Sequence, residues 1–262
     1  MGAVREIMLN IMLSGCCGSM GRAVTAFADN RDDIKITAGI DREGRECRFP
    51  TFVSPFSFNG KVDVIIDFSS PAALPGLLEY AVSAKTPTVI ATTGLNEAHT
   101  ALIYKAAKEI PIFFSANMSL GINLLCELAK TAARVLGGTY DIEIVETHHA
   151  QKTDAPSGTA LMLADAISSE LERKPYYEYD RHLRRTRRPH DEIGIHSIRG
   201  GTAVGEHEII FAGYNETIKL SHCAQSKELF AAGAVNAAKF IQNKEPGLYG
   251  MSDMIDRKDA KK

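Results

Sequence analysis

Short apolar runs alternate with amphipathic stretches through the first 118 residues of the chain. The apolar runs predict buried strands at residues 7–13, 34–40, 62–67, 88–91 and 111–115. Helices are predicted between them, at residues 23–28, at residues 96–109, and from a start with Ser70 as cap and Pro71 in the first position. Strands that alternate with helices predict a Rossmann-like, doubly wound parallel sheet.

The pattern changes after residue 118. A long apolar helix is predicted at residues 120–136, a strand at 140–146 and a helix at 157–172. Three strand-like runs then follow one another, at 193–199, 206–212 and 217–222, before a last helix at 227–242 and a polar tail at 251–262. Strands in a row predict a second α+β domain with an open mixed sheet. We expect a first domain of residues 1–118, completed by the C-terminal helix and tail 228–262, and a second domain of residues 119–227.

Charge and composition narrow the class of protein. The net charge of −2 argues against a nucleic-acid partner, and no apolar run approaches the ~20 residues that span a bilayer. The N-terminus lacks the long apolar core of a secretion signal. The cysteines are odd in number and follow no C-x-x-C spacing: Cys16, Cys17, Cys47, Cys126 and Cys223. We therefore expect a cytoplasmic protein with free thiols, no metal site and no membrane partner.

A glycine-rich turn follows the first predicted strand. Gly15, Gly18 and Gly21 give a G-x-x-G-x-x-G spacing, which departs from G-x-G-x-x-G because Cys17 holds the middle place. A turn between a strand and a helix, with an acid about twenty residues further on, predicts a dinucleotide site whose pyrophosphate lies at the helix N-terminus. An ordinary glycine-rich turn is the alternative that these residues leave open.

The residues after the later strands extend this cofactor site. Asp41 is expected to bind the adenosine ribose hydroxyls of NAD, and Arg42 the 2′-phosphate of NADP, so we expect NADH and/or NADPH as cofactor. Two further strand ends supply candidates for the nicotinamide side, namely Ala91, Thr92 and Thr93, and Ser115, Ala116, Asn117 and Met118. Solvated loops are the alternative for all of these positions.

The segment from Glu146 to Ala160, ETHHAQKTDAPSGTA, carries the strongest chemical signal. His148 and Lys152 are proton donors suited to neutral pH. Ser157, Gly158 and Thr159 stand at a predicted helix start, where backbone N–H groups bind a carboxylate. A solvated turn is the alternative, and a zinc site from His148 and His149 is disfavoured because adjacent side chains diverge. The segment predicts an enzyme that acts on a small carboxylate.

This segment resembles the signature of the 4-hydroxy-tetrahydrodipicolinate (dihydrodipicolinate) reductase family of lysine biosynthesis. The resemblance spans nearly the whole chain and includes the glycine turn through Arg22, Asp67-Phe-Ser, Thr92-Thr-Gly and residues 116–123, 198–201, 204–207 and 245–249. It implies NAD(P)H-dependent reduction of a cyclic dicarboxylate imine in diaminopimelate and lysine biosynthesis. Hydride would go to ring C4 after water has left, and protonation would follow. It also implies a homotetramer, assembled through the open sheet of the second domain.

The resemblance assigns roles to single residues. His148 matches the family's proton donor/acceptor and Lys152 its second proton donor. The substrate-binding positions are His149, Gly158 and Thr159, with Ser157 as an extra contact. The first cofactor turn comprises Gly15, Cys16, Cys17, Gly18, Ser19 and Met20. Ala91 stands where many members have glycine, and Cys17 occupies a variable place that suggests thiol-sensitive NAD(P)H binding.

Two other functions are weighed against this one. A different two-domain NAD(P)-dependent dehydrogenase with a cysteine nucleophile is disfavoured, because Cys126 and Cys223 fall in a predicted helix and strand. A non-catalytic cofactor-sensing module would not need both His148 and Lys152. The basic run at residues 181–189 is expected to be a solvated or subunit-contacting loop, with anion or nucleic-acid binding as the alternative. His196, His207 and His222 are expected to be structural, and Arg199, before two glycines, could reach a partner loop, although no feature of the sequence shows it.

Overall fold

The chain forms two structural units. The computed structural model describes residues 8–42, 47–182 and 184–255. One unit contains the chain up to Met118 together with the part from Lys227 onward, and the other contains Ser119–Ser226. Ile7 and residues 256–262, which belonged to predicted elements, lie outside the described residues. No helix in the described part is both long and apolar enough to cross a bilayer.

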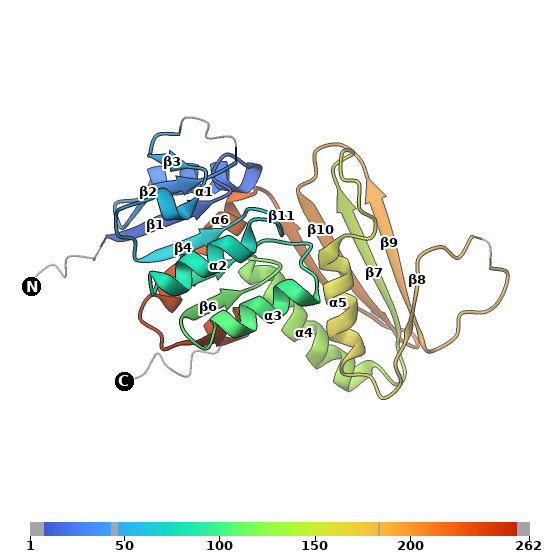
Figure 1. The fold of residues 1–262 in the computed structure, drawn as a ribbon. Coiled ribbons are helices and arrows are strands. Elements are labelled where there is room, and N and C mark those ends of the chain that lie inside the picture. Colours follow the sequence, from blue (N-terminus) through green and yellow to red (C-terminus); the bar gives the residue numbers. More distant parts are fainter. Residues whose placement is uncertain (1–7, 43–46, 183, 256–262) are drawn as a thin grey trace, which may run out of the picture. The chain divides into compact units, whose positions relative to one another are not determined.

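The first unit is built on a seven-stranded parallel sheet (Figure 1), and the predicted fold class is confirmed. Its spatial order is β12-β6-β5-β4-β1-β2-β3. The five longer strands match the predicted runs: β1 (Leu9–Ser14), β2 (Ile34–Ile40), β4 (Val64–Asp67), β5 (Thr88–Ile90) and β6 (Pro111–Phe114). Two short edge strands were missed, β3 (Thr51–Phe52) and β12 (Gly247–Tyr249), because two or three residues carry no readable periodicity.

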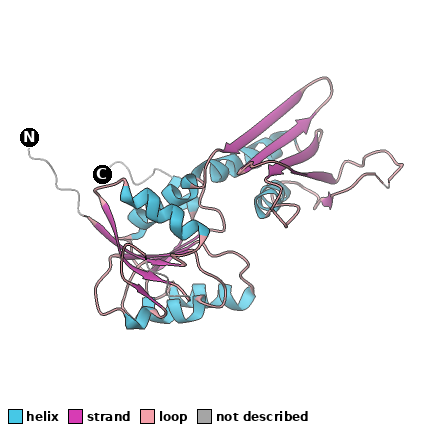
Figure 2. Cartoon of the chain, turned by 90° about the horizontal axis from the view of Figure 1, so that it is seen from above, coloured by secondary structure: helices cyan, strands magenta, loops and turns pink. Residues whose placement is uncertain are grey.

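Helices cover both faces of this sheet (Figure 2). On one face α1 (Ser19–Asp29) packs against α6 (Glu228–Ile241), and α6 also contacts β4, β5 and β6. On the other face lie α2 (Leu74–Ser83) and α3 (Glu97–Ala106), above a separate apolar core. Gly233 lets α6 approach closely, since a Cβ there would lie 1.8 Å from the Met118 carbonyl oxygen.

Two local predictions were wrong in this unit. Pro71 does not begin a helix: residues 71–73 form a turn, and α2 starts at Leu74 with Pro75 in its first turn. A start at Pro71 would have placed Pro75 inside the helix, where proline lacks the required N–H and its ring meets the carbonyl four residues back. The predicted polar tail begins with a short helix, α7 (Met251–Ile255), because Met251 is buried in the core. The 3₁₀ turn Pro55–Ser57 was not predicted.

The second unit is a mixed five-stranded sheet in the order β11-β10-β7-β9-β8. Its strands are β7 (Asp141–His148), β8 (Tyr176–Glu178), β9 (Glu192–Arg199), β10 (Gly205–Ala212) and β11 (Thr217–Ala224). Strands β7, β8 and β9 run parallel, and β10 is antiparallel to both neighbours. Helices α4 (Leu120–Leu136) and α5 (Gly158–Ser168) pack together and cover one sheet face. The mixed sheet was predicted, but the short β8 was not.

Strand alternation in β7 places the chemistry of this unit. Ile142, Ile144, Glu146 and His148 are buried, whereas the residues between them are half-buried. Side chains of alternate residues share one sheet face, so the carboxylate and the imidazole point to the same side as the two apolar residues. The two isoleucines form the core under α4 and α5, and the two polar residues continue that face at the carboxyl end of the strand.

Candidate active site

The carboxyl ends of the parallel strands bring the predicted cofactor residues to one edge of the first unit. Ser14 pairs with both Ile40 and Asp67, and Ile90 pairs with both Asp67 and Phe114. The loops that follow these strands therefore stand in a row. Strand β1 lies between β2 and β4, so the order reverses beside it, and ligands of open α/β sheets bind at this kind of reversal.

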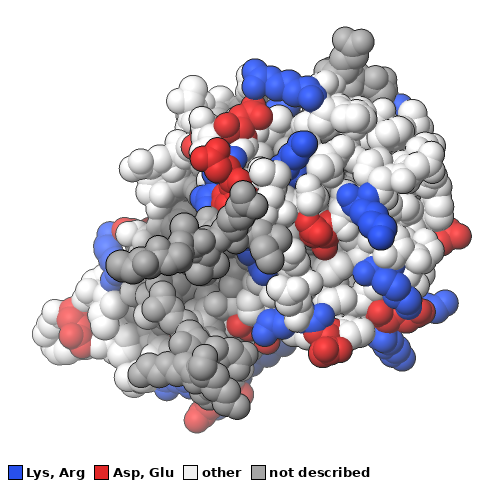
Figure 3. Space-filling model, turned by 90° about the vertical axis from the view of Figure 1, so that its left-hand side faces the viewer, with Lys and Arg blue, Asp and Glu red and all other residues white. Residues whose placement is uncertain are grey.

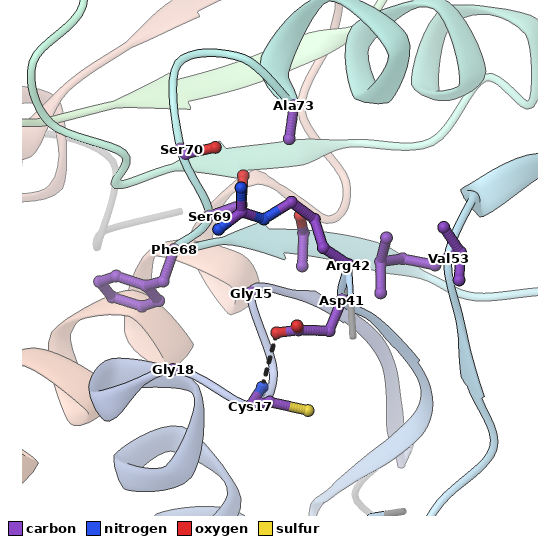
Figure 4. Close-up of a pocket in the computed structure, with 12 residues that line it drawn as sticks. Gly15, Cys17, Gly18, Asp41, Arg42, Val53, Phe68, Ser69, Ser70 and Ala73 are labelled. Atoms are coloured by element: carbon purple, nitrogen blue, oxygen red, sulfur yellow. Dashed lines mark hydrogen bonds between the residues drawn. The ribbon is translucent and has the colours of Figure 1, made fainter. Parts of the chain in front are cut away.

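A cavity of about 320 Å³ lies at this reversal (Figure 4). Five predicted cofactor residues line it: Gly15, Cys17, Gly18, Asp41 and Arg42. The remaining lining residues are Ser14, Ile40, Val53, Phe68, Ser69, Ser70 and Ala73. In Figure 4, Arg42 extends toward the loop that carries Ser69 and Ser70. That loop follows β4. Because ligands bind at the carboxyl ends of parallel strands, this loop is a candidate on the same grounds as Ala91 and Ser115.

Glycine is required at two positions of the turn. Gly15 has φ +76°, and a Cβ there would lie 2.5 Å from the Phe68 carbonyl oxygen. A Cβ on Gly21 would lie 2.3 Å from the carbonyl oxygen of Gly15. Gly18 is the N-cap of α1 and supplies no side-chain cap, so the N–H groups of the first helical turn are available to an anion. The turn therefore fits a phosphate.

Asp41 has a structural contact as well as a place in the cavity. Its Oδ2 accepts a hydrogen bond from the Cys17 N–H at 3.0 Å. Ser19 and Met20 begin α1, and the Ser19 hydroxyl accepts a hydrogen bond from Lys227 Nζ at 3.0 Å. Cys16 is buried beneath the turn and does not line the cavity.

The two later loops lie at the same sheet edge but outside this cavity. Thr92 is buried and donates its hydroxyl to the Asp67 carboxylate at 2.7 Å, and the Ala91 N–H donates to the Asp67 carbonyl. Burial raises the pKa of Asp67, and hydrogen bonds from Ser69, Thr92 and Ser14 oppose this. Thr93, in the same loop as Thr92, is exposed, whereas in the second loop Asn117 and Met118 are buried and Ala116 is exposed. The Ser115 hydroxyl donates to the Asn117 carbonyl at 2.8 Å.

Glu146 organises the candidate site of the second unit. Its side chain is fully buried, and its two oxygens accept bidentate hydrogen bonds from Arg199, each at 2.7 Å. The Ser157 N–H donates to Oε1 at 3.0 Å, and His148 Nδ1 lies 2.6 Å from Oε2. Burial acts to raise the pKa of Glu146, but these hydrogen bonds outweigh it and hold the pKa at about 2. Glu146 is therefore a fixed anion beside the imidazole.

His148 lies at the end of β7 with a single carboxylate partner. Burial lowers its pKa, and the hydrogen bond and charge of Glu146 act in the opposite direction. Because Nδ1 is bonded to Glu146, Nε2 is the nitrogen left for proton transfer. That atom faces Gly205, where an added Cβ would lie 3.0 Å from it. The pairing fixes the ring orientation and partly offsets the lowering of the pKa by burial, which keeps more of the ring protonated, as a general acid requires.

Ser157 and His207 complete the buried network. Ser157 Oγ lies 3.0 Å from His207 Nε2 and accepts the Ala160 N–H at 3.1 Å, which caps α5. The rings of His207 and His148 meet edge to face, with centroids 5.2 Å apart. Burial and the neighbouring His148 lower the pKa of His207 to about 4, so it is neutral near pH 7. The N–H and the hydroxyl of Ser157 are therefore both engaged in hydrogen bonds within the protein.

The other predicted residues surround this network in loops. Gly158 is exposed, and a Cβ added there would meet nothing within 4 Å, so there is open space beside the α5 N-terminus. Thr159 follows it in the first turn of α5. Lys152 Nζ pairs with Asp154 Oδ1 at 2.8 Å, and the Lys152 N–H donates to the His149 carbonyl. His149 is half-buried, and its N–H donates to the Ala203 carbonyl at 2.8 Å.

Sequence reasoning missed three members of the network. Glu146 stands two residues before His148, and the alternation of a strand was a signal that they share a face. Arg199 had been assigned no role at the site, and it bonds Glu146 and the Asp154 carbonyl within the chain. His207 was expected to be structural. Arg199 and His207 reach the site because β9 and β10 flank β7 in the sheet, and no local sequence pattern predicts which strands are neighbours.

Three arginines of the basic run at residues 181–189 pair with acids. Arg181 pairs with Glu192, Arg184 with Glu178 at 2.8 Å, and Arg188 with Asp141 at 2.7 Å. Arg188 also pairs with Glu143 at 2.9 Å. Figure 3 shows a different face of the chain, on which the coloured basic and acidic side chains are intermixed. These pairings favour a structural role for the loop.

Comparisons with known proteins agree over both units. Residues 9–118 match the family model for the N-terminus of dihydrodipicolinate reductase, and residues 121–255 match the model for its C-terminus. The chain is 49% identical over 251 residues to a 4-hydroxy-tetrahydrodipicolinate reductase of Caldanaerobacter subterraneus subsp. tengcongensis, covering 96% of this chain and 100% of the relative. It is 47% identical over 249 residues to that of Clostridium botulinum, covering 95% and 98%.

A solved structure shows the same fold. Dipicolinate-bound dihydrodipicolinate reductase from Paenisporosarcina sp. TG-14 superposes with a TM-score of 0.78 at 23% identity. The match covers 95% of this chain and 100% of that one.

Proposed function

The chain belongs to the dihydrodipicolinate reductase family, and from that premise we propose that it reduces 4-hydroxy-tetrahydrodipicolinate to tetrahydrodipicolinate with NADH or NADPH. The reaction serves diaminopimelate and lysine biosynthesis. The observation that carries the proposal is the Glu146–His148 pair at the carboxyl end of β7, held by Arg199 beside the N-terminus of α5. This arrangement joins a proton donor to an anion site.

The first unit holds the cofactor, which supplies hydride when bound. Gly15, Gly18 and the first turn of α1 cradle the pyrophosphate, and Asp41 and Arg42 read the adenosine ribose. Ser19, Met20 and the two loops at residues 91–93 and 115–118 complete the site along the same sheet edge. Residues 1–118 with 228–262 therefore act as the dinucleotide-binding domain.

The second unit, residues 119–227, holds the substrate. The N–H groups of Gly158 and Thr159 bind one substrate carboxylate at the α5 N-terminus, with His149 as a further contact. The open space at Gly158 supports this placement. Ser157 acts by positioning, since its groups are bonded to Glu146, His207 and Ala160. Dipicolinate, which the Paenisporosarcina structure binds, is a planar dicarboxylate of this type.

His148 and Lys152 manage the protons. After water has left C4 and that carbon has received hydride, the ring is an enamine-like anion that needs one proton on the neighbouring carbon. His148 Nε2 delivers this proton, and the Glu146 carboxylate stabilises the imidazolium before transfer. Lys152, which forms an ion pair with Asp154, acts as the second proton donor. Positioned acids of this kind contribute ~10²–10⁴-fold in rate.

The test follows NADH and NADPH oxidation with freshly prepared cyclic substrate. We expect turnover by the unmodified chain, a fall of ~10²–10⁴-fold in kcat for His148→Gln, and cofactor dissociation constants that barely change. His149→Gln is the matched control and is expected to raise KM more than it lowers kcat. Absence of oxidation by the unmodified chain would refute the function, and near-normal kcat for His148→Gln would remove His148 from the mechanism.

Assembly and location belong to the same proposal. We propose a homotetramer in the cytoplasm. The side chains of the second unit's sheet that point away from α4 and α5 include the exposed Ile198 and the half-buried Ile210, which supports packing against other copies. Light scattering that gives the mass of a monomer would exclude this assembly.

A further inference from the structure

Three cysteine sulfurs converge beneath the nucleotide turn. Cys16 and Cys17 follow β1, and Cys47 comes from the segment before β3. Their three Sγ atoms lie within 4.8 Å of one another, with 3.8 Å between Cys16 and Cys17 and 3.7 Å between Cys17 and Cys47. No local pattern in the sequence predicts this group, because residue 47 lies thirty positions away from residue 17.

The positions of these sulfurs are fixed by their surroundings. Cys16 is buried, and Gly39 on β2 makes room for its thiol, since a Cβ at Gly39 would lie 2.7 Å from Cys16 Sγ. The Cys17 N–H is bonded to Asp41. Cys17 and Cys47 are half-buried. Two of the three thiols thus remain partly open to solvent.

The spacing is that of sulfurs around a metal ion. A Zn–S bond of about 2.3 Å in a tetrahedral site puts sulfurs ~3.8 Å apart, whereas a disulfide requires about 2.05 Å. Soft thiolates select Zn²⁺ and Cu⁺ among biological cations. We propose that Cys16, Cys17 and Cys47 form a binding site for a thiophilic cation, with Zn²⁺ and Cu⁺ as the two candidates.

Binding involves no oxidation. Each thiol that coordinates releases its proton, and the cation takes up three sulfur ligands. For Zn²⁺ a fourth position stays open to water, and for Cu⁺ three sulfurs are enough. The sequence-based expectation of no metal site rested on the odd number of cysteines and on the missing C-x-x-C spacing, but folding brings together three cysteines that are not closely spaced along the chain.

The site touches the cofactor cavity. Cys17 lines that cavity, and its backbone is bonded to Asp41, the residue assigned to the adenosine ribose. A cation held by Cys17 is therefore expected to weaken NAD(P)H binding. This second consequence rests on the proposed function, whereas the metal site rests on the sulfur positions alone.

Metal stoichiometry tests the site without any activity measurement. The reduced, metal-free chain is titrated with Zn²⁺ against a chromophoric chelator, with Cu⁺ in a parallel arm. Cd²⁺ serves as a spectroscopic substitute that gives an ultraviolet thiolate-to-metal band. We expect one ion per chain, a thiolate band, and affinity lowered at least ~100-fold in Cys47→Ser, since even indirect supports of metal sites are worth 10–100-fold. Cys223→Ser, which alters an exposed cysteine elsewhere, is the control and should bind as before.

Three outcomes would overturn the metal site. They are no tight ion in either arm, unchanged affinity in Cys47→Ser, and Cd²⁺ binding without a thiolate band, which would point to histidines. A loss of two titratable thiols on air exposure without metal uptake would instead show a disulfide. The link to the cofactor is checked by measuring the NADPH dissociation constant with and without one equivalent of Zn²⁺, and equal values would refute it. Failure of the reductase assay in metal-free protein would reject the proposed function and leave the metal result standing.

Discussion

Glu146→Gln is the substitution that tests the site most directly. Glutamine has nearly the same shape, but it removes the negative charge that faces Arg199 and His148. It also replaces an acceptor of four hydrogen bonds, two from Arg199 and one each from Ser157 and His148, by a group with one acceptor oxygen. The change therefore acts on both stability and chemistry.

The expected loss of stability follows from burial. Glu146 is 0% exposed and Arg199 has a side chain 19% exposed, so the variant leaves a largely buried guanidinium without its carboxylate. Removing one partner of a buried ion pair costs about 3–5 kcal/mol. At about 2–4 °C per kcal/mol for a chain of this size, Tm is expected to fall by roughly 10 °C. The variant remains folded at 25 °C if the chain has an ordinary stability of 5–15 kcal/mol.

The effect on chemistry has a direction that can be read from the pKa of His148. The hydrogen bond and the charge of Glu146 both raise that pKa, and burial lowers it. Without Glu146 only the lowering influences remain, so the protonated fraction of His148 at a given pH falls. The alkaline limb of the kcat profile should move to lower pH. The decrease in kcat near pH 7.5 should approach ~10²–10⁴-fold, which is the full contribution of a general acid.

The assay combines thermal unfolding with kcat and KM measured from pH 5 to pH 9. Glu143→Gln is the matched control, because Glu143 lies on the same strand and pairs with Arg188 and His196 at the half-buried face. It is expected to cost less than Glu146→Gln, because Arg188 keeps its ion pair with Asp141 and its hydrogen bonds to backbone carbonyls, and to leave the pH profile in place. A Glu146→Gln enzyme with the control's kcat and an unmoved alkaline limb would refute the positioning role and leave Glu146 with a purely structural one.

Three further predictions concern Lys152, Arg42 and the titration of Glu146. Lys152→Ala should lower kcat and raise KM together, each by about tenfold or more, because the ammonium acts as proton donor and attracts the dianionic substrate; an effect on neither parameter would exclude it from the site. Arg42→Ala should weaken NADPH far more than NADH in fluorescence titrations, since only NADPH carries the 2′-phosphate, and equal loss with both would show that Arg42 does not read it. The pKa of Glu146 is about 2 in the folded chain against an ordinary 4.5, so its contribution to stability is complete above pH 4.5 and is lost as pH falls toward 2. Urea midpoints should therefore drop over that window in the unmodified chain and drop less in Glu146→Gln.

Local patterns determined much of this protein. The apolar runs located the five longer strands of the first sheet and the three late strands of the second, and residues 120–136 form the predicted helix. The glycine turn predicted a phosphate site, and the segment from Glu146 to Ala160 predicted a site for a small carboxylate. Both predictions were possible because several functional residues lie within a few positions of one strand end. Such patterns are local, so they specify the same turn or helix start wherever the element lies in the fold.

Tertiary structure decided which distant residues meet. Arg199 reaches Glu146 because β9 pairs with β7 in parallel, and His207 reaches Ser157 because β10 pairs with β7 on its other side. Cys47 joins Cys16 and Cys17 through a segment with no pattern of its own. Strand order and register depend on the burial of the whole sheet, and no window of the sequence contains that information. The sequence by itself determined the proposed proton donors and the glycine turn, whereas the fold determined the carboxylate–guanidinium support of His148 and the three-sulfur cluster, because these depend on contacts between segments far apart in the chain.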